Sequence, residues 1–244
     1  MTRNRLVLHT WTLDTTPLAD VLRIARRVGW DGVEHGWMLA EGAEHRRLLD
    51  AFAESCRWAA ALGAPRVMSP VDRDAGDLGR AAASVREVGD LAAAEGVTLA
   101  LEFNSQVAQF NSLERLRELL ALAGHPRCRL LLDTYHLQRS GGGPASLADV
   151  AGDEIAYVQY SDVPREGLEP GKATDRLPPG QGIVPFHEIF TILAGKGCGG
   201  DLSYEAPNPA AWARDPETVA REALAATRAC LPAARIGGAP PCSS

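Results

Sequence analysis

Four side chains with oxygen donors stand at or near the ends of short apolar runs in this chain. Glu102 is the last residue but one of VTLALEF, Asp133 ends RLLLD, Gln159 lies in IAYVQYSD, and Glu205 ends DLSYE. Three carboxylates brought together in a partly dry site repel one another, and a proton or a cation relieves the repulsion. An all-oxygen set suits Mn²⁺ or Mg²⁺ better than Zn²⁺, and Co²⁺ can substitute. The residue types therefore predict a divalent-cation site, with Mn²⁺ as the first choice.

Each of these residues, taken alone, also has a simpler interpretation. An acid that closes a strand is more often a cap or a salt-bridge partner than a metal ligand. The shared position is what favours the metal, because equivalent strand ends of successive βα repeats converge on one axis of a barrel. The hypothesis therefore concerns the set and not any single member.

The elements that must position these side chains alternate along the chain. Short β-branched runs are followed by stretches of helical period, which is typical of βα units around a parallel sheet. No G-x-G-x-x-G phosphate loop supports an open doubly wound sheet, so the pattern favours an α/β fold of the (β/α)8 TIM-barrel type. Seven strands are predicted, at Leu6–Thr10, Gly32–His35, Arg66–Pro70, Val97–Phe103, Arg129–Asp133, Ile155–Ser161 and Asp201–Glu205.

Capping signals predict where several helices begin and end. A capping box formed by Asn111 and Glu114 opens a helix that stops at Gly124. The last helix starts after Asp215, with Pro216 at its first position.

One βα unit is predicted to be short or missing near residues 38–46. The chain from Trp37 to the strand at Arg66 carries a single helical pattern, where two helices and a strand would normally fit. The segment Gly36–Ala40 is a poor substitute for the absent strand. We expect one barrel domain over residues 1–232 and a flexible tail, rich in Pro, Gly and Ser, over residues 233–244.

Composition limits the classes of partner. The chain has 244 residues, 45% of them hydrophobic, and a formal charge of −6, which argues against a basic surface for nucleic acid or anionic membrane. Its 5 cysteines are scattered and form no disulfide or zinc pattern. No secretory signal or membrane-spanning run is visible, so a cytoplasmic location is expected. A homo-oligomer is left open.

Six segments together resemble the xylose isomerase-like TIM barrel superfamily, in its sugar phosphate isomerase/epimerase branch: VGWDGVEHGW, LALEFN, LLLDTYH, VQYSD, RLPPGQG and LSYEAPNP. The resemblance implies that Glu102, Asp133 and Glu205 are the acidic metal ligands. Gln159 stands where many ketose epimerases have histidine. In having glutamine at this position the chain is similar to hydroxypyruvate isomerases and 3-dehydroshikimate dehydratases, whose metal ligands are also Glu, Asp, Gln and Glu.

The resemblance also implies residues that bind substrate. His136 matches a substrate-contacting histidine, and Arg176 matches an arginine that holds a substrate hydroxyl or oxyanion. His9 either lines the pocket or fills the barrel interior. Trp11 either forms an apolar wall over the sugar or packs a loop. Glu34 is expected to make a structural hydrogen bond.

These residues predict a metal-dependent isomerase or epimerase of a small sugar, ketose or sugar acid. Such chemistry needs a base for a C–H proton beside a carbonyl and stabilisation of the enediolate. Glu102 and Glu205 are the predicted acid/base pair. A dehydratase of the 3-dehydroshikimate type and a hydroxypyruvate isomerase are alternatives. A non-catalytic, degenerate barrel is a further one, because of the short unit. An AP endonuclease-like nuclease is disfavoured, because the chain is acidic and lacks the histidines for three zinc ions.

Overall fold

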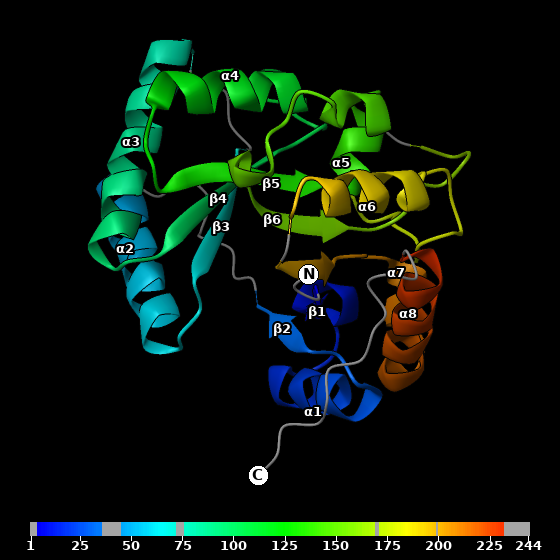
Figure 1. Cartoon of the computed structure of the whole chain (residues 1–244). Helices are drawn as coiled ribbons and strands as arrows, with labels where there is room; N and C mark the ends of the chain where they lie inside the picture. The colour runs from blue at the N-terminus through cyan, green and yellow to red at the C-terminus, as the bar shows by residue number, and fades with distance from the viewer. Residues whose placement is uncertain (1–3, 36–44, 72–75, 169–170, 199, 232–244) are drawn as a thin grey trace. The chain divides into compact units, whose positions relative to one another are not determined.

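The chain divides into two compact units (Figure 1). A computed structural model describes residues 4–35, 45–71, 76–168, 171–198 and 200–231. The terminal unit comprises Met1–Gly36, Gly143–Gly152 and Val158–Ser244, and the middle unit comprises Trp37–Gly142 and Asp153–Tyr157. In each unit strands alternate with helices along the chain, which confirms the predicted α/β class.

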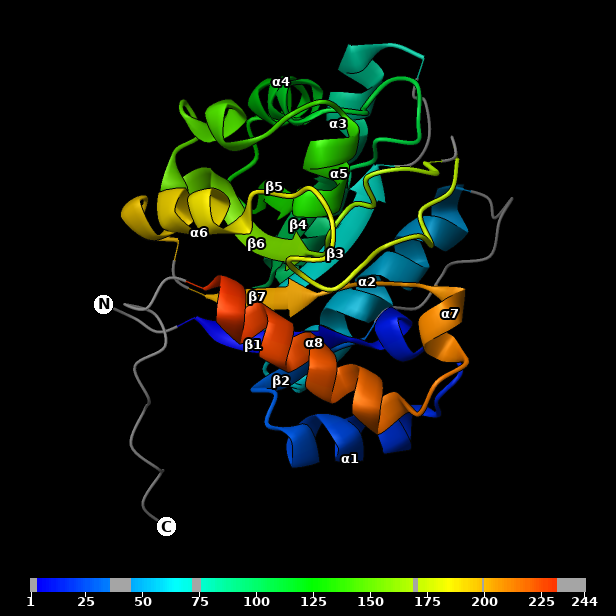
Figure 2. The ribbon, with the colours of Figure 1, turned by 90° about the vertical axis from the view of Figure 1, so that its right-hand side faces the viewer.

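The terminal unit carries a group of parallel strands in the order β2-β1-β7-β6. Figure 2 shows α1 and α8 lying alongside one another next to these strands. Its elements are β1 (Arg5–His9), η1 (Thr10–Leu13), α1 (Leu18–Val28), β2 (Gly32–Glu34), η2 (Pro144–Leu147), α6 (Phe186–Gly195), β7 (Asp201–Tyr204), α7 (Pro209–Trp212), α8 (Pro216–Cys230) and the second half of β6 (Ile155–Tyr160).

The middle unit carries the parallel strands β3, β4 and β5 in sequence order. Helices α3 and α4 cover these strands (Figure 1). The elements are α2 (His45–Ala61), β3 (Arg66–Val71), α3 (Leu78–Ala94), β4 (Thr98–Phe103), α4 (Leu113–Ala123), β5 (Cys128–Asp133) and α5 (Thr134–Arg139). The short η3 (Gly152–Glu154) leads into the first half of β6.

The described residues contain the seven predicted strands. Each observed strand agrees with its predicted bounds to within one residue at either end. The region near residues 38–46, where a βα unit is predicted to be short or missing, falls mostly outside the described residues, as do Trp37, the segment Gly36–Ala40 and the tail. The single-domain boundary at 232 stays a prediction.

One predicted helix cap is wrong by one residue. Ser112, and not Asn111, is the N-cap of α4, because its hydroxyl accepts from the backbone N–H of Arg115. The Asn111 amide instead donates to the carbonyl of Ala108. The predicted end at Gly124 is confirmed, with a left-handed φ of 60°. The start of α8 is confirmed too, with Asp215 capping the N–H of Thr218.

Aromatic rings form the core of the terminal unit on the helix-facing side of its strands. Tyr160 and Tyr204 are paired in register on β6 and β7 and are fully buried. Trp30 stacks on Tyr204 at 6.0 Å, and Phe190 meets Tyr160 edge-on at 5.7 Å. Burial raises the pKa of both tyrosines, and Tyr160 bonds the Thr227 hydroxyl of α8 at 3.0 Å. This packing fixes the two strands whose opposite faces carry Gln159 and Glu205.

The core of the middle unit is aliphatic. Strand β4 turns Leu99, Leu101 and Phe103 to one face, all buried, and places the small Ala100 beside Glu102 on the other. Cys128 is buried at the start of β5, and burial raises its pKa to about 11, so it is a packed thiol rather than a nucleophile. None of the helices in the described parts combines the length and apolar content that a bilayer crossing requires.

A buried carboxylate anchors the long loop that follows β6. Asp162 is 0% exposed and accepts four backbone N–H groups, at 2.7–2.9 Å, from Val163, Gly180, Gly182 and Val184. A Cβ on Gly182 would collide with the Val163 carbonyl oxygen and the Asp162 carboxylate. Gly180 has a left-handed φ of 85°. Gly182 is therefore required by the close approach, and Gly180 is favoured by its backbone conformation.

Replacement of Asp162 by asparagine tests this anchor. The Asp162→Asn variant presents an NH₂ group to two of the backbone donors, which then lose their acceptor. We expect the free energy of unfolding in urea to fall by about 2–3 kcal/mol. The exposed Asp14→Asn variant is the matched control and is expected to unfold like the wild type. Equal unfolding midpoints for both variants would contradict the anchor.

Candidate functional site

Five polar side chains meet on one face of the strands of the terminal unit. The Glu205 group, as we name it, consists of His9, Glu34, Gln159, Arg176 and Glu205. Strand register places His9 beside Glu34 and Gln159 beside Ser203, two residues before Glu205. Because side chains alternate along a strand, these positions share one face. Four of the five are nearly inaccessible, with 0–6% of their surface exposed, and the Glu34 side chain is 11% exposed.

Arg176 forms a buried ion pair with Glu205. Its Nη1 donates to Oε2 of Glu205 at 3.0 Å and lies 3.4 Å from the backbone carbonyl of the same residue. Its Nε donates to the Ala173 carbonyl at 3.2 Å, and Asn208 donates to the Arg176 carbonyl. Sequence resemblance predicts a substrate-binding arginine here. The structure adds a second role, which is to compensate the charge of the buried Glu205 carboxylate.

His9 lies between two carboxylates. Its Nδ1 accepts the Trp11 backbone N–H at 3.1 Å, which assigns the ring proton of the neutral form to Nε2. Nε2 lies 3.8 Å from Glu34 and Nδ1 lies 3.5 Å from Glu205. Whether His9 lines a pocket or fills the interior stays a prediction. Trp11 is half-buried in η1, where its carbonyl accepts from the Trp212 indole.

Glu34 makes the hydrogen bond expected of it, and its partner is Gln159. The Gln159 Nε2 donates to Glu34 Oε1 at 3.0 Å across 125 positions of sequence. The other amide atom, Oε1, is buried and has no hydrogen-bond partner among the described residues. The Gln159 Oε1 atom can therefore accept a hydrogen bond or bind a cation.

A second buried group lies in the middle unit. The Glu102 group consists of Glu102 on β4, Asp133 at the end of β5 and His136 on α5, and their ligand atoms lie within 4.8 Å of one another. All three side chains are buried. The Nε2 of His136 lies 3.9 Å from Glu102 and 4.0 Å from Asp133. Two of the four predicted ligands, Glu102 and Asp133, are thus brought together within the middle unit.

Ser105 orients the His136 ring. The Ser105 backbone N–H points at Nδ1 at 3.2 Å, and its hydroxyl lies 2.8 Å from the same atom. An N–H donor at Nδ1 assigns the proton of the neutral ring to Nε2, which faces the two carboxylates. This tautomer suits a hydrogen-bond donor rather than a metal ligand. Sequence reasoning missed Ser105, whose only signal is its place just after the strand that ends near Glu102.

Both groups have the donor chemistry that a divalent cation requires. The middle unit offers the carboxylates of Glu102 and Asp133. The terminal unit offers the Gln159 carbonyl oxygen and the Glu205 carboxylate. Carboxylate and amide oxygens suit hard divalent ions. The predicted four-ligand set takes two members from each unit, and its convergence on one ion stays a prediction.

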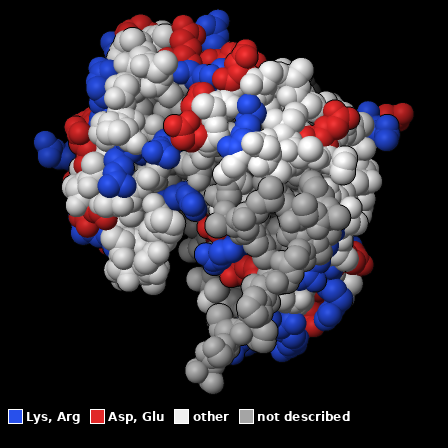
Figure 3. Space-filling model, in the orientation of Figure 1, with Lys and Arg blue, Asp and Glu red and all other residues white. Residues whose placement is uncertain are grey.

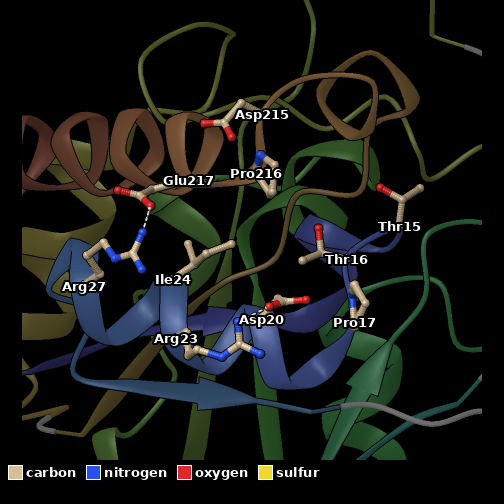
Figure 4. Close-up of a pocket in the computed structure, with 10 residues that line it drawn as sticks. All are labelled: Thr15, Thr16, Pro17, Asp20, Arg23, Ile24, Arg27, Asp215, Pro216 and Glu217. Carbon is tan, nitrogen blue, oxygen red and sulfur yellow. Dashed lines mark hydrogen bonds and ion pairs between the residues drawn. The ribbon is translucent and has the colours of Figure 1, made fainter.

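A surface hollow in the terminal unit contains none of these residues. It has a volume of about 460 Å³ and lies between α1, along most of its length, and the first turn of α8 (Figure 4). Both of its arginines pair with acidic side chains of the lining, Arg27 with Glu217 at 2.7 Å and Arg23 with Asp20. Its third acid, Asp215, caps α8 through the Thr218 N–H. On the face drawn in Figure 3, acidic and basic side chains are interspersed.

The ion pair of Arg176 and Glu205 is expected to contribute strongly to stability. Their side chains are only 2% and 8% exposed, so Arg176→Met leaves an uncompensated carboxylate in a dry place. We expect a loss of about 3–5 kcal/mol in the free energy of unfolding. Arg176→Lys keeps the charge and is expected to lose less, although its ammonium cannot reproduce the guanidinium geometry. The exposed Arg23→Met serves as control, and a wild-type midpoint for Arg176→Met would contradict the pairing.

Comparison with curated proteins finds enzymes at low identity. The 3-dehydroshikimate dehydratase of Pseudomonas putida is 28% identical over 142 residues, which is 57% of this chain and 22% of that protein. The inosose isomerase of Halalkalibacterium halodurans is 28% identical over 126 residues, which is 50% of this chain and 44% of that protein. The chain therefore spans less than half the length of these relatives. Both relatives are named as enzymes.

Solved structures and a family model give the fold. A structure of the IOLI protein with a bound zinc atom aligns with a TM-score of 0.80 at 19% identity, over 93% of this chain and 98% of that one. The likeness confirms the predicted TIM-barrel type of fold. A family model described as xylose isomerase-like TIM barrel matches residues 5–230. Because this match runs from β1 to the end of α8, the chain belongs to the xylose isomerase-like TIM barrel family.

Proposed function

We propose that this chain is a divalent-metal-dependent isomerase or epimerase of a small ketose, sugar or sugar acid. The observation that carries the proposal is the pair of buried acidic groups at the strand ends, one around Glu102 and one around Glu205. Carboxylates brought together in a buried place repel one another, and a proton or a metal ion relieves the repulsion. The isomerase among the relatives supports the same reaction class.

The proposed ligands are Glu102, Asp133, Gln159 and Glu205. Support comes from family membership, because strand ends of barrels in general converge on one catalytic face. When bound, a divalent ion supplies Lewis acidity to a carbonyl and its neighbouring hydroxyl. Mn²⁺ is the proposed ion because the set is all oxygen.

The side chains then divide the proton transfers. Glu205 removes the proton from the carbon beside the carbonyl, and the electron pair of that C–H bond moves toward the oxygen. Glu102, in its protonated form, returns a proton to the substrate anion. For epimerisation the proton goes to the opposite face of the same carbon. For isomerisation it goes to the former carbonyl carbon, and the proton of the neighbouring hydroxyl moves to the former carbonyl oxygen. His136 donates from Nε2 to the oxygen where negative charge develops. Arg176 holds Oε2 of Glu205, which leaves Oε1 as the basic atom.

A dehydratase is the second candidate. The observation that favours it is Gln159, because glutamine at this position resembles 3-dehydroshikimate dehydratases, and one such enzyme is 28% identical to part of the chain. Dehydration would follow if the same proton abstraction were followed by loss of a hydroxyl group from the β-carbon as water.

Deuterium exchange tests the proposed function. The Mn²⁺-loaded chain is incubated in D₂O with neutral ketoses, hydroxypyruvate and 3-dehydroshikimate, and products are followed by NMR. We expect deuterium at the carbon beside the carbonyl together with an isomerised or epimerised product. Loss of water from 3-dehydroshikimate would instead identify the dehydratase, and no exchange with any compound would contradict both.

The Glu205→Gln variant tests the assigned base. It removes a base and a charge at nearly constant volume, so we expect kcat to fall by about 10³-fold while the chain still folds, as checked by circular dichroism. Glu188→Gln, an exposed change on α6, is the control and is expected to keep wild-type turnover. Wild-type activity in Glu205→Gln would remove Glu205 from the mechanism.

A further inference from the structure

We propose that Glu34 is a positioning residue that orients the Gln159 amide, so that Oε1 and not Nε2 is presented to a divalent cation. This inference rests on the proposed function, because it takes Gln159 as a ligand. It assigns a role to a carboxylate that the proposed mechanism does not use. All the contacts that carry it lie within the terminal unit.

The direction of the hydrogen bond fixes the orientation of the amide. The Nε2 of Gln159 lies 3.0 Å from Oε1 of Glu34, and the Gln159 residue is 0% exposed. An ionised carboxylate only accepts hydrogen bonds, so the amide must turn its NH₂ group toward Glu34. The flipped amide would bring two acceptor oxygens together in a buried place, which is unfavourable.

The environment of the Gln159 Oε1 atom indicates the function of this orientation. Gln159 Oε1 is buried and has no hydrogen-bond partner among the described residues. Most buried polar atoms in native proteins have a partner, and an exception calls for an explanation such as a bound ion. An amide oxygen is a good ligand for a hard divalent cation, whereas an amide NH₂ is not. Glu34 therefore selects the atom that can bind a metal.

Glu34 is itself held in place. It ends the short strand β2 and is paired in register with His9 on β1. The same oxygen that accepts from Gln159 lies 3.8 Å from His9 Nε2, the atom to which the ring proton is assigned. The Glu34 carboxylate thus faces donors from two strands, and its rotation away from Gln159 would break both contacts. Partners of metal ligands commonly act in this way on ligand orientation.

The Glu34→Gln variant separates orientation from packing. A glutamine at this position has nearly the same volume but offers either an oxygen or an NH₂ group, so Gln159 can adopt both amide orientations. The full-length chain is titrated with Mn²⁺ by calorimetry, without substrate. We expect Glu34→Gln to bind Mn²⁺ about 10-fold more weakly than the wild type. Glu188→Gln, exposed on α6, is the matched control and is expected to bind like the wild type.

A spectroscopic readout detects the orientation without metal. In the metal-free protein labelled with ¹⁵N, the Gln159 side-chain amide is expected to give one pair of proton signals in the wild type. The same amide is expected to give two sets, or a shifted average, in Glu34→Gln. A merely structural role for Glu34 would change the unfolding midpoint and leave the amide signals single.

A third variant, Gln159→Ala, makes the outcomes distinguishable. If Gln159→Ala weakens Mn²⁺ binding and Glu34→Gln does not, the positioning role is overturned and the proposed metal site stands. If Gln159→Ala binds as well as the wild type, or the wild type binds no Mn²⁺, the proposed ligand set fails and the inference fails with it. Weaker binding in both variants, with the control unchanged, supports the inference.

Discussion

A carboxylate buried at the end of a strand must be given hydrogen-bond donors or a compensating charge, and much of this chain is arranged to meet that demand. Asp162 is satisfied by four backbone N–H groups. Glu205 is satisfied by Arg176, and Glu34 accepts from Gln159. Asp133 caps α5, because its Oδ1 accepts the backbone N–H of Tyr135 at 2.8 Å. The Nε2 of His136 lies 3.9 Å from Glu102 and 4.0 Å from Asp133. In the proposed site a divalent cation adds positive charge beside these two carboxylates.

The same demand links the long loop after β6 to chemistry. Asp162 draws the P-G-x-G segment against the end of β6, and Gly182 is needed because any side chain there would strike the carboxylate. Four residues before Gly180, the loop places Arg176 on Glu205. A carboxylate with no part in the proposed reaction therefore positions the arginine that compensates the proposed base. Loss of Asp162 is then a loss of both loop order and site geometry.

Periodicity predicted the strands well, because each βα repeat buries one apolar run and ends it with a polar residue. The cap of α4 was displaced by one position, since Asn111 and Ser112 are both good caps and only the local fold chooses between them. The acids at the strand ends were visible in the sequence, but their partners were not. Gln159 and Glu34 are separated by 125 positions and Arg176 and Glu205 by 29, so only tertiary structure pairs them. Ser105 has no signal in the sequence beyond its place just after β4, because its backbone N–H and hydroxyl meet His136 only in the folded chain.

The central claim is that one divalent ion joins Glu102, Asp133, Gln159 and Glu205. The most direct measurement is anomalous X-ray diffraction at the manganese edge from crystals of the Mn²⁺-loaded chain. The account predicts a single strong peak in contact with an oxygen of each of these four side chains, with the Gln159 oxygen and not its nitrogen turned toward it. A peak bound elsewhere, or no peak at saturating Mn²⁺, would contradict it.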